Sequence, residues 1–344
     1  MGKRLDVRGT VIHTRRAFVA GLSLALAAGG ARAQLRRITI GANPAGTNFN
    51  LVAGGFAKVL QESLGIPSIV RPYAGSSSYV PLLQRGEITL GINSSIDSFL
   101  SYTGQTPYPA AMTRLRGLMS VYPLGYMYWV RGSSDMRRVE DLRGKRVVLN
   151  YRGLVPLDRL NRAILATGGL TEDDVVAVTA AGLPEGARIV NEGRADAVAM
   201  GYRLPLVVQM DTALSGGLRF LTMGRDESKV SELMPGAGVI TVAPREGIVG
   251  IDEPKRFAVY DTYLNTGTHL PEEDAYRIVA ALHGAWSQLQ RDYAVLADVA
   301  QSTLAPVQPP HPYHAGAVEY FRGAGLWTPA HDANQARALG GARA

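Results

Sequence analysis

The chain alternates short apolar runs with amphipathic segments over most of its length. Residues 38–40 form a strand-like run, and apolar residues in 49–60 recur at the three- and four-residue spacing of one helix face. The alternation continues with a strand at 68–71, a helix that ends at Gly86 and a strand at 87–93. This βαβαβ order predicts a parallel sheet with covering helices.

A second series of the same kind occupies residues 144–223, so the pattern predicts two α/β lobes. Between the two series lies a long aromatic and apolar run, 115–131, and a shorter run, 238–243, follows the second series. We expect these two runs to cross between the lobes as hinge strands, near 122–130 and 238–243. The predicted boundaries are 34–123 plus 242–329 for a discontinuous lobe 1, 124–241 for lobe 2, and a loose tail over 330–344.

The N-terminus has the pattern of an export signal. Arg15-Arg16 precedes an apolar run at 19–28, and the small-residue site Ala31-Arg32-Ala33 stands before Gln34. The alternative is an uncleaved anchor, but the run is shorter than the roughly 20 residues that span a bilayer. The sequence therefore predicts a twin-arginine-type signal peptide over 1–33, cleaved after Ala33, and a mature protein in the periplasm.

Composition and charge exclude several classes of function. The 344 residues include no cysteine, which excludes disulfides, thiolate metal sites and cysteine nucleophiles. The formal net charge is +7, of which residues 1–33 carry +5, so the mature chain is left with +2. Its basic residues form no dense run, and nucleic acid is therefore not an expected partner.

Small polar residues fill three predicted strand-to-helix turns, at 43–48, 75–78 and 93–97. The carboxyl ends of parallel strands meet at one edge of a sheet, where open α/β sheets bind ligands. Helix N-termini at that edge favour negative charge, so the turns predict a site for a small anionic molecule. The alternative is that Thr47, Ser76 and Ser94 only cap helices.

A set of segments in this order resembles the TAXI-type solute receptors of TRAP transporters. The segments are "TIGANPAGTNFN", "GSSSYVPLLQRGEITLGINSS", "VEDLRGKRVVLN", "GGLTEDDVV" and "HPYHAGAVEYFRGAGLW". The resemblance implies a two-lobed, type II-like periplasmic binding protein, a monomer, that hands an anionic carboxylate or amino acid to TRAP membrane subunits. An ABC-type binding protein and a periplasmic enzyme remain the alternatives.

The resemblance also implies ligand-binding residues in the first lobe. The family's glycine-rich turn with its aromatic contact corresponds to Asn43, Gly46, Thr47, Asn48 and Phe49. Its Gly-Ser turn and the polar end of its third strand correspond to Gly75, Ser76, Asn93 and Ser94.

The chain departs from the family's pattern in two places. Leu124 follows Tyr122-Pro123 where the family has a glutamate, and "NYRGLVP", 150–156, replaces a Ser-Gly-Thr turn of the second lobe. Arg152 in that turn suits a carboxylate, since its guanidinium can donate two parallel hydrogen bonds, although it could equally be a surface arginine.

Further candidates in the second lobe follow from position. Tyr202 and Arg203 stand at another predicted strand end and are expected to reach the ligand. Tyr126, Tyr128 and Trp129 could pack the hinge or form an aromatic wall of the cleft.

Motifs of the common enzyme classes are absent from the sequence. It contains no H-E-x-x-H, G-x-S-x-G or Walker-type pattern. His311-x-x-His314 with Glu319 is a weak metal candidate, because a site needs three or four ligands and prolines interrupt the stretch. We therefore expect a protein that is not an enzyme, with no catalytic residue, cofactor or metal.

Overall fold

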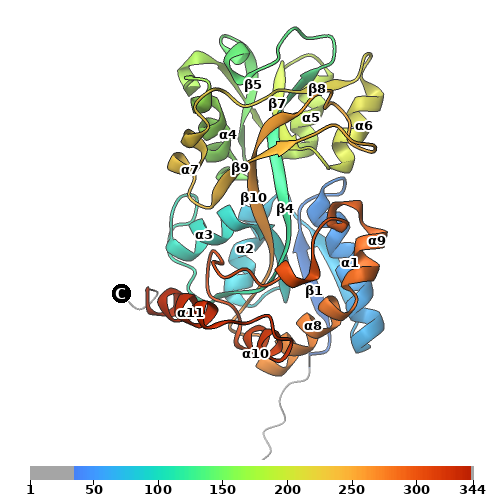
Figure 1. Ribbon diagram of the computed structural model, residues 1–344, viewed down its shortest axis with the longest axis vertical. Coiled ribbons are helices and arrows are strands. Elements are labelled where there is room, and N and C mark those ends of the chain that lie inside the picture. Colours follow the sequence, from blue (N-terminus) through green and yellow to red (C-terminus); the bar gives the residue numbers. More distant parts are fainter. Residues whose placement is uncertain (1–34, 342–344) are drawn as a thin grey trace, which may run out of the picture. The chain divides into compact units, whose positions relative to one another are not determined.

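The computed structural model describes residues 35–341, and the predicted signal peptide over 1–33 lies outside these residues. Its strands form one mixed ten-stranded sheet in the order β2-β1-β3-β10-β4-β7-β5-β6, with β8 beside β4 and β9 beside β10 (Figure 1). Among the described residues, no helix combines the length and hydropathy needed to cross a membrane.

The first series of elements follows the predicted βαβαβ order. β1 pairs in parallel with both β2 and β3, so the carboxyl ends of all three strands share one edge. The predicted apolar face of the first helix is buried, from Phe49 to Leu60. The elements are β1 (Ile38–Ala42), α1 (Asn48–Leu64), β2 (Ser68–Pro72), α2 (Ser76–Arg85), β3 (Leu90–Ser94) and α3 (Ser95–Thr103).

The second series builds the other lobe. β5 pairs in parallel with β6 and β7, again bringing three carboxyl ends to one edge. The elements are β5 (Arg146–Tyr151), α4 (Val155–Thr167), β6 (Val176–Ala180), α5 (Leu183–Asn191), β7 (Ala197–Gly201), α6 (Pro205–Ala213), β8 (Leu218–Phe220), α7 (Ser228–Leu233) and β9 (Ala237–Val242), with short 3-10 turns at Val139–Leu142 and Glu172–Asp174.

Two long antiparallel strands, β4 (Leu115–Arg131) and β10 (Lys255–Gly267), connect the two groups of elements (Figure 1). β4 pairs with β7, whereas β10 pairs with β3 through Thr262–Asn265 and with β9 through Lys255–Tyr260. The predicted crossing over 115–131 is therefore β4. The second crossing strand is β10, not 238–243, because β9 ends at Val242 and the chain turns back before it crosses.

The C-terminal part returns to the first lobe and ends in a helix. Its elements are α8 (Glu272–Gly284), α9 (Trp286–Asp292), α10 (Ala315–Gly323) and α11 (Pro329–Gly341), with 3-10 turns at Ala294–Leu296 and Gln301–Thr303. The sequence predicts a loose tail from residue 330, but the structure has α11 there. Buried His331 bonds the Ala305 carbonyl oxygen at 2.9 Å, and Gln335 exchanges hydrogen bonds with the backbone of Tyr313. The composition of residues 330–344 does not indicate such contacts with distant parts of the backbone.

Candidate functional site

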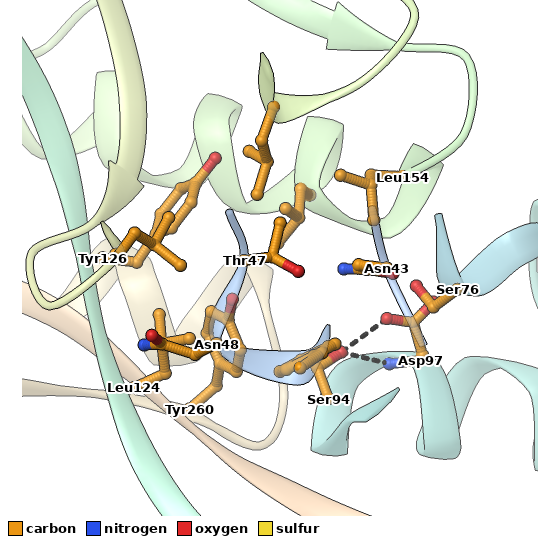
Figure 2. Close-up of a pocket in the computed structure, with 15 residues that line it drawn as sticks. Asn43, Thr47, Asn48, Ser76, Ser94, Asp97, Leu124, Tyr126, Leu154 and Tyr260 are labelled. Carbon is orange, nitrogen blue, oxygen red and sulfur yellow. Dashed lines mark hydrogen bonds between the residues drawn. The ribbon is translucent and has the colours of Figure 1, made fainter. Parts of the chain in front are cut away.

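A pocket lies at the edge where the strands of the first lobe end (Figure 2). The space between its walls is about 400 Å³, including its open mouth. The first lobe gives it mainly polar side chains, carried by the turns after β1 and β3 and by the starts of α1, α2 and α3. These residues are Asn43, Thr47, Asn48, Phe49, Ser76, Ser94 and Asp97.

The opposite wall is apolar. Its residues follow the carboxyl ends of β5, β6 and β7, and the crossing strands complete it. They are Leu154, Leu157, Leu183, Gly201 and Leu204 from the second lobe, with Leu124, Tyr126 and Tyr260 from β4 and β10. The pocket therefore has one polar and one hydrocarbon side, a common composition of small-molecule sites.

The two lobes touch each other around this pocket. The backbone N–H of Leu206 donates to the Gly46 carbonyl oxygen at 3.2 Å. At the other contact the turns of Gly75 and Gly153 meet so closely that a Cβ on residue 75 would lie 1.9 Å from the Gly153 carbonyl oxygen. The structure is thus the closed arrangement, and only glycine fits at position 75 in it.

Asp97 is the charged residue of the pocket and is 3% exposed. Its carboxylate accepts hydrogen bonds from the Ser94 hydroxyl at 2.6 Å and the Tyr108 hydroxyl at 3.0 Å. Burial raises the pKa of Asp97 above its ordinary value, while hydrogen bonds from the Ser94 and Tyr108 hydroxyls lower it by less. The sequence prediction missed Asp97, although the Ser94-x-x-Asp97 spacing at a helix start is a recognisable signal.

Several pocket side chains are buried without a hydrogen-bond partner among the described residues. They are the Asn43 Oδ1, both amide atoms of Asn48 and the Ser76 hydroxyl. Buried polar atoms are nearly always paired in folded proteins, because water is lost without replacement. The unpaired atoms of this pocket are therefore available to hydrogen-bond a bound molecule.

We expect Asn48→Leu to raise stability and weaken ligand binding together. Asn48 is 1% exposed and its amide has no partner in the described chain, so its removal should add about 1 kcal/mol to the free energy of unfolding. Urea unfolding and calorimetric titration measure the two effects. Asn50→Leu is the matched control, because Asn50 donates to the Asn43 carbonyl oxygen at 3.2 Å and its loss should lower stability.

The predicted first-lobe residues divide into pocket, contact and support positions. Gly46 and Gly75 do not line the pocket but form the contacts with the second lobe described above. Asn93 lies behind the pocket, where its amide donates to the Ser98 hydroxyl and accepts from the Asn265 amide, both at 2.9 Å. The structure brings together these pocket residues: Asn43, Thr47, Asn48, Phe49, Ser76 and Ser94.

The predicted second-lobe residues lie outside the pocket. Arg152 is exposed and Arg203 pairs with Asp298 at 3.1 Å, while Tyr202 packs edge-on against Phe257. The backbone N–H of Arg152 bonds the distant Ala180 carbonyl oxygen, and the turn presents Leu154 to the pocket instead of Arg152. Among the described residues, the pocket lining includes no arginine, lysine or histidine.

Helix capping and site formation are compatible at two of the three turns. Thr47 accepts from the Asn50 N–H and Ser94 from the Asp97 N–H, and both also line the pocket. At the remaining turn Gly75 is the N-cap, and Ser76 is the first residue of α2. The Ser76 hydroxyl is therefore left for the pocket.

The aromatic run of β4 is divided between wall and core. Tyr126 lines the pocket, and its hydroxyl donates to the Asn161 amide oxygen at 3.0 Å. Tyr128 and Trp129 are completely buried outside the lining and pack the core. The sequence left these two roles open, and both occur.

The predicted metal candidate serves packing and capping. His314 accepts from the Gly316 N–H at the start of α10, and its other ring nitrogen bonds the Leu270 carbonyl oxygen. His311 is buried beside Tyr102. Within residues 35–341, no group of three or more histidines and carboxylates has the arrangement of a metal site.

Three solved structures share this architecture. The alkanesulfonate-binding protein SsuA from Xanthomonas axonopodis pv. citri bound to MOPS is 19% identical, with 87% of this chain and 96% of that chain covered and a TM-score of 0.50. A periplasmic transporter is 14% identical, with 88% of this chain and 96% of that chain covered and a TM-score of 0.56. The periplasmic binding protein BugD is 12% identical, with 76% of this chain and 87% of that chain covered and a TM-score of 0.53. At these identities the likeness shows the fold, and the predicted two-lobed periplasmic binding-protein fold is confirmed.

A family model extends the comparison to sequence. The model of the NMT1-like family matches residues 40–325, which include both lobes and every wall of the pocket. The chain therefore belongs to the NMT1-like family.

Proposed function

We propose that this protein is an extracytoplasmic receptor that encloses a small organic solute between its lobes and delivers it to a membrane transporter. The observation that carries the proposal is a pocket lined by both lobes, in which buried polar atoms of the first lobe have no hydrogen-bond partner among the described residues.

The transporter that we favour is of the ABC type. The NMT1-like family match and the likeness to SsuA support the ABC-type reading that the sequence left as an alternative. A TRAP carrier is the second candidate, supported by the ordered segments that resemble TAXI receptors. Uptake of the solute by membrane vesicles supplied with purified receptor distinguishes them, since ATP drives the first and an ion gradient the second.

We place the mature protein in the periplasm. The proposal rests on the signal-peptide pattern over 1–33, which lies outside the described residues, and on the periplasmic proteins that share the fold.

The anionic solute expected from the sequence loses one support in the closed pocket. That expectation rested partly on Arg152 or Arg203 reaching the ligand, and neither lines the pocket. The helix N-termini remain as an argument for an anion.

We expect the receptor to be stabilised by its solute and to change between open and closed arrangements. A library of small metabolites screened by thermal shift should give hits, because a ligand at 100 times its Kd adds about 2.7 kcal/mol of stability. Small-angle scattering should then show compaction on binding. A library without hits, or turnover of the bound compound, would count against the proposal.

A further inference from the structure

We propose that the solute presents an N–H or O–H donor to Asp97 and carries no negative charge at that end, with a hydrocarbon body against the leucines of the second lobe. This inference rests on the proposed function and specifies the class of solute that the receptor takes.

The protein's own carboxylate already occupies a position that favours an anion. Asp97 lies in the first turn of α3, where its backbone N–H bonds the Ser94 hydroxyl. The partial positive charge of the α3 N-terminus therefore acts on Asp97. A carboxylate or sulfonate bound beside it would meet a like charge in a closed space.

The pocket lining offers no counter-charge to a second anion among the described residues. Two negative groups buried together need a cation, because a buried charge without a partner is strongly disfavoured. In the part of the chain that the structure describes, no cationic side chain lines the pocket. Arg203 is held by Asp298, which also pairs with Arg245 at 3.0 Å.

Hydrogen-bond acceptors gather at this end of the pocket. Figure 2 shows Asn43, Ser76, Ser94 and Asp97 grouped together. The Asp97 carboxylate oxygens accept from the Ser94 and Tyr108 hydroxyls, and the Asn43 Oδ1, in a residue 4% exposed, is a further acceptor that no group within 35–341 satisfies. These atoms are complemented by a donor, such as an amine, an amide or a ring N–H.

The remaining walls define the other end of the solute. Leu154 stands in the turn that replaces the Ser-Gly-Thr turn of TAXI-type receptors, and further leucines come from the starts of α4 and α5 and from before α6. These leucines offer hydrocarbon contact. A branched aliphatic or aromatic body fits such a wall.

Two matched sets of probes test the charge of the solute. Isoamylamine, isovaleramide and isovalerate share one hydrocarbon body, and phenylethylamine, phenylacetamide and phenylacetate share another. Thermal shift and calorimetric titration should show binding of the amines or amides and at least tenfold weaker binding of the matched carboxylates. The metabolite library sorted by charge should give its hits among donors that are cationic or neutral.

Variants of the pocket separate recognition from structural damage. Asp97→Asn should weaken binding of the best amine by at least tenfold and strengthen binding of the matched carboxylate. Misfolding does not produce such a reversal of preference. Ser76→Ala should also weaken the amine while preserving the fold, since the Ser76 hydroxyl has no hydrogen-bond partner in the described chain. Asp158→Asn is the control outside the pocket, and its affinity for the amine should be within twofold of that of the unmodified protein.

Two results would overturn the inference in different ways. A carboxylate or sulfonate that binds more tightly than its matched amide, with Asp97→Asn showing no reversal, would refute the inference and leave the receptor role intact. The absence of any hit among cations, neutrals and anions would contradict the receptor role, and the inference with it.

Discussion

Replacing Gly75 by alanine is expected to weaken solute binding by at least about 100-fold without unfolding the protein. The added Cβ would lie 1.9 Å from the Gly153 carbonyl oxygen and 2.8 Å from the Leu154 side chain. A backbone carbonyl cannot move aside as a flexible side chain can, so the lobes could not close to the observed distance. The solute would keep only its first-lobe contacts, and 100-fold corresponds to about 2.7 kcal/mol of binding free energy.

The fold should tolerate this change because the backbone of Gly75 is extended, with φ at 174°. Calorimetric titration measures the affinity, and small-angle scattering should show that compaction with solute is lost. Gly54→Ala is the matched control, since a Cβ there meets nothing within 4 Å in the described structure. Binding by Gly75→Ala within twofold of the control would mean that the observed closure is not the solute-bound state.

Below pH 6.5 the protein is expected to lose stability through His311. Burial, with a smaller contribution from Arg116, lowers the pKa of His311 from 6.5 to about 4 in the folded protein. Between these values the unfolded chain binds a proton that the folded protein does not, so the free energy of unfolding falls as the pH falls. At about 1.4 kcal/mol per pKa unit the loss amounts to about 3 kcal/mol near pH 4, and it is absent above pH 7.

The difference between the unmodified protein and His311→Gln isolates this effect. Urea unfolding from pH 7 to pH 4 should show the difference in stability shifting by about 3 kcal/mol in favour of the glutamine variant. Asp158 acts in the opposite direction, because burial raises its pKa to about 6 and the folded protein takes up a proton first as the pH falls. Asp158→Asn should therefore make the acid loss steeper. A difference independent of pH would show that folding does not shift the pKa of His311.

The local pattern of the sequence was enough to predict the first-lobe side of the site. Alternating strands and amphipathic helices imply parallel β1, β2 and β3, and parallel strands place the turns that follow them at one edge. Thr47 and Ser94 were recognisable because helix starts demand side-chain acceptors. These features depend on residues within a few positions of each other, which a sequence displays directly.

The direction of a side chain in a turn was not determined locally. Arg152 and Leu154 belong to the same turn, and only the hydrogen bond between the Arg152 N–H and the Ala180 carbonyl oxygen decides which of them faces the pocket. The crossing by β10 and the helix α11 likewise depend on pairing with residues far away in the chain.

Which charged side chains line the pocket depends on how the two lobes close. From the sequence, arginines were expected near the cleft and an aspartate at a helix start. The sequence did not show which of these side chains would lie inside the closed pocket. Tertiary structure puts Asp97 inside and leaves Arg203 outside with Asp298. The physical reason is that enclosure depends on contacts between segments more than 50 residues apart, such as Gly75 against Gly153 and Gly46 against Leu206, which no local pattern contains.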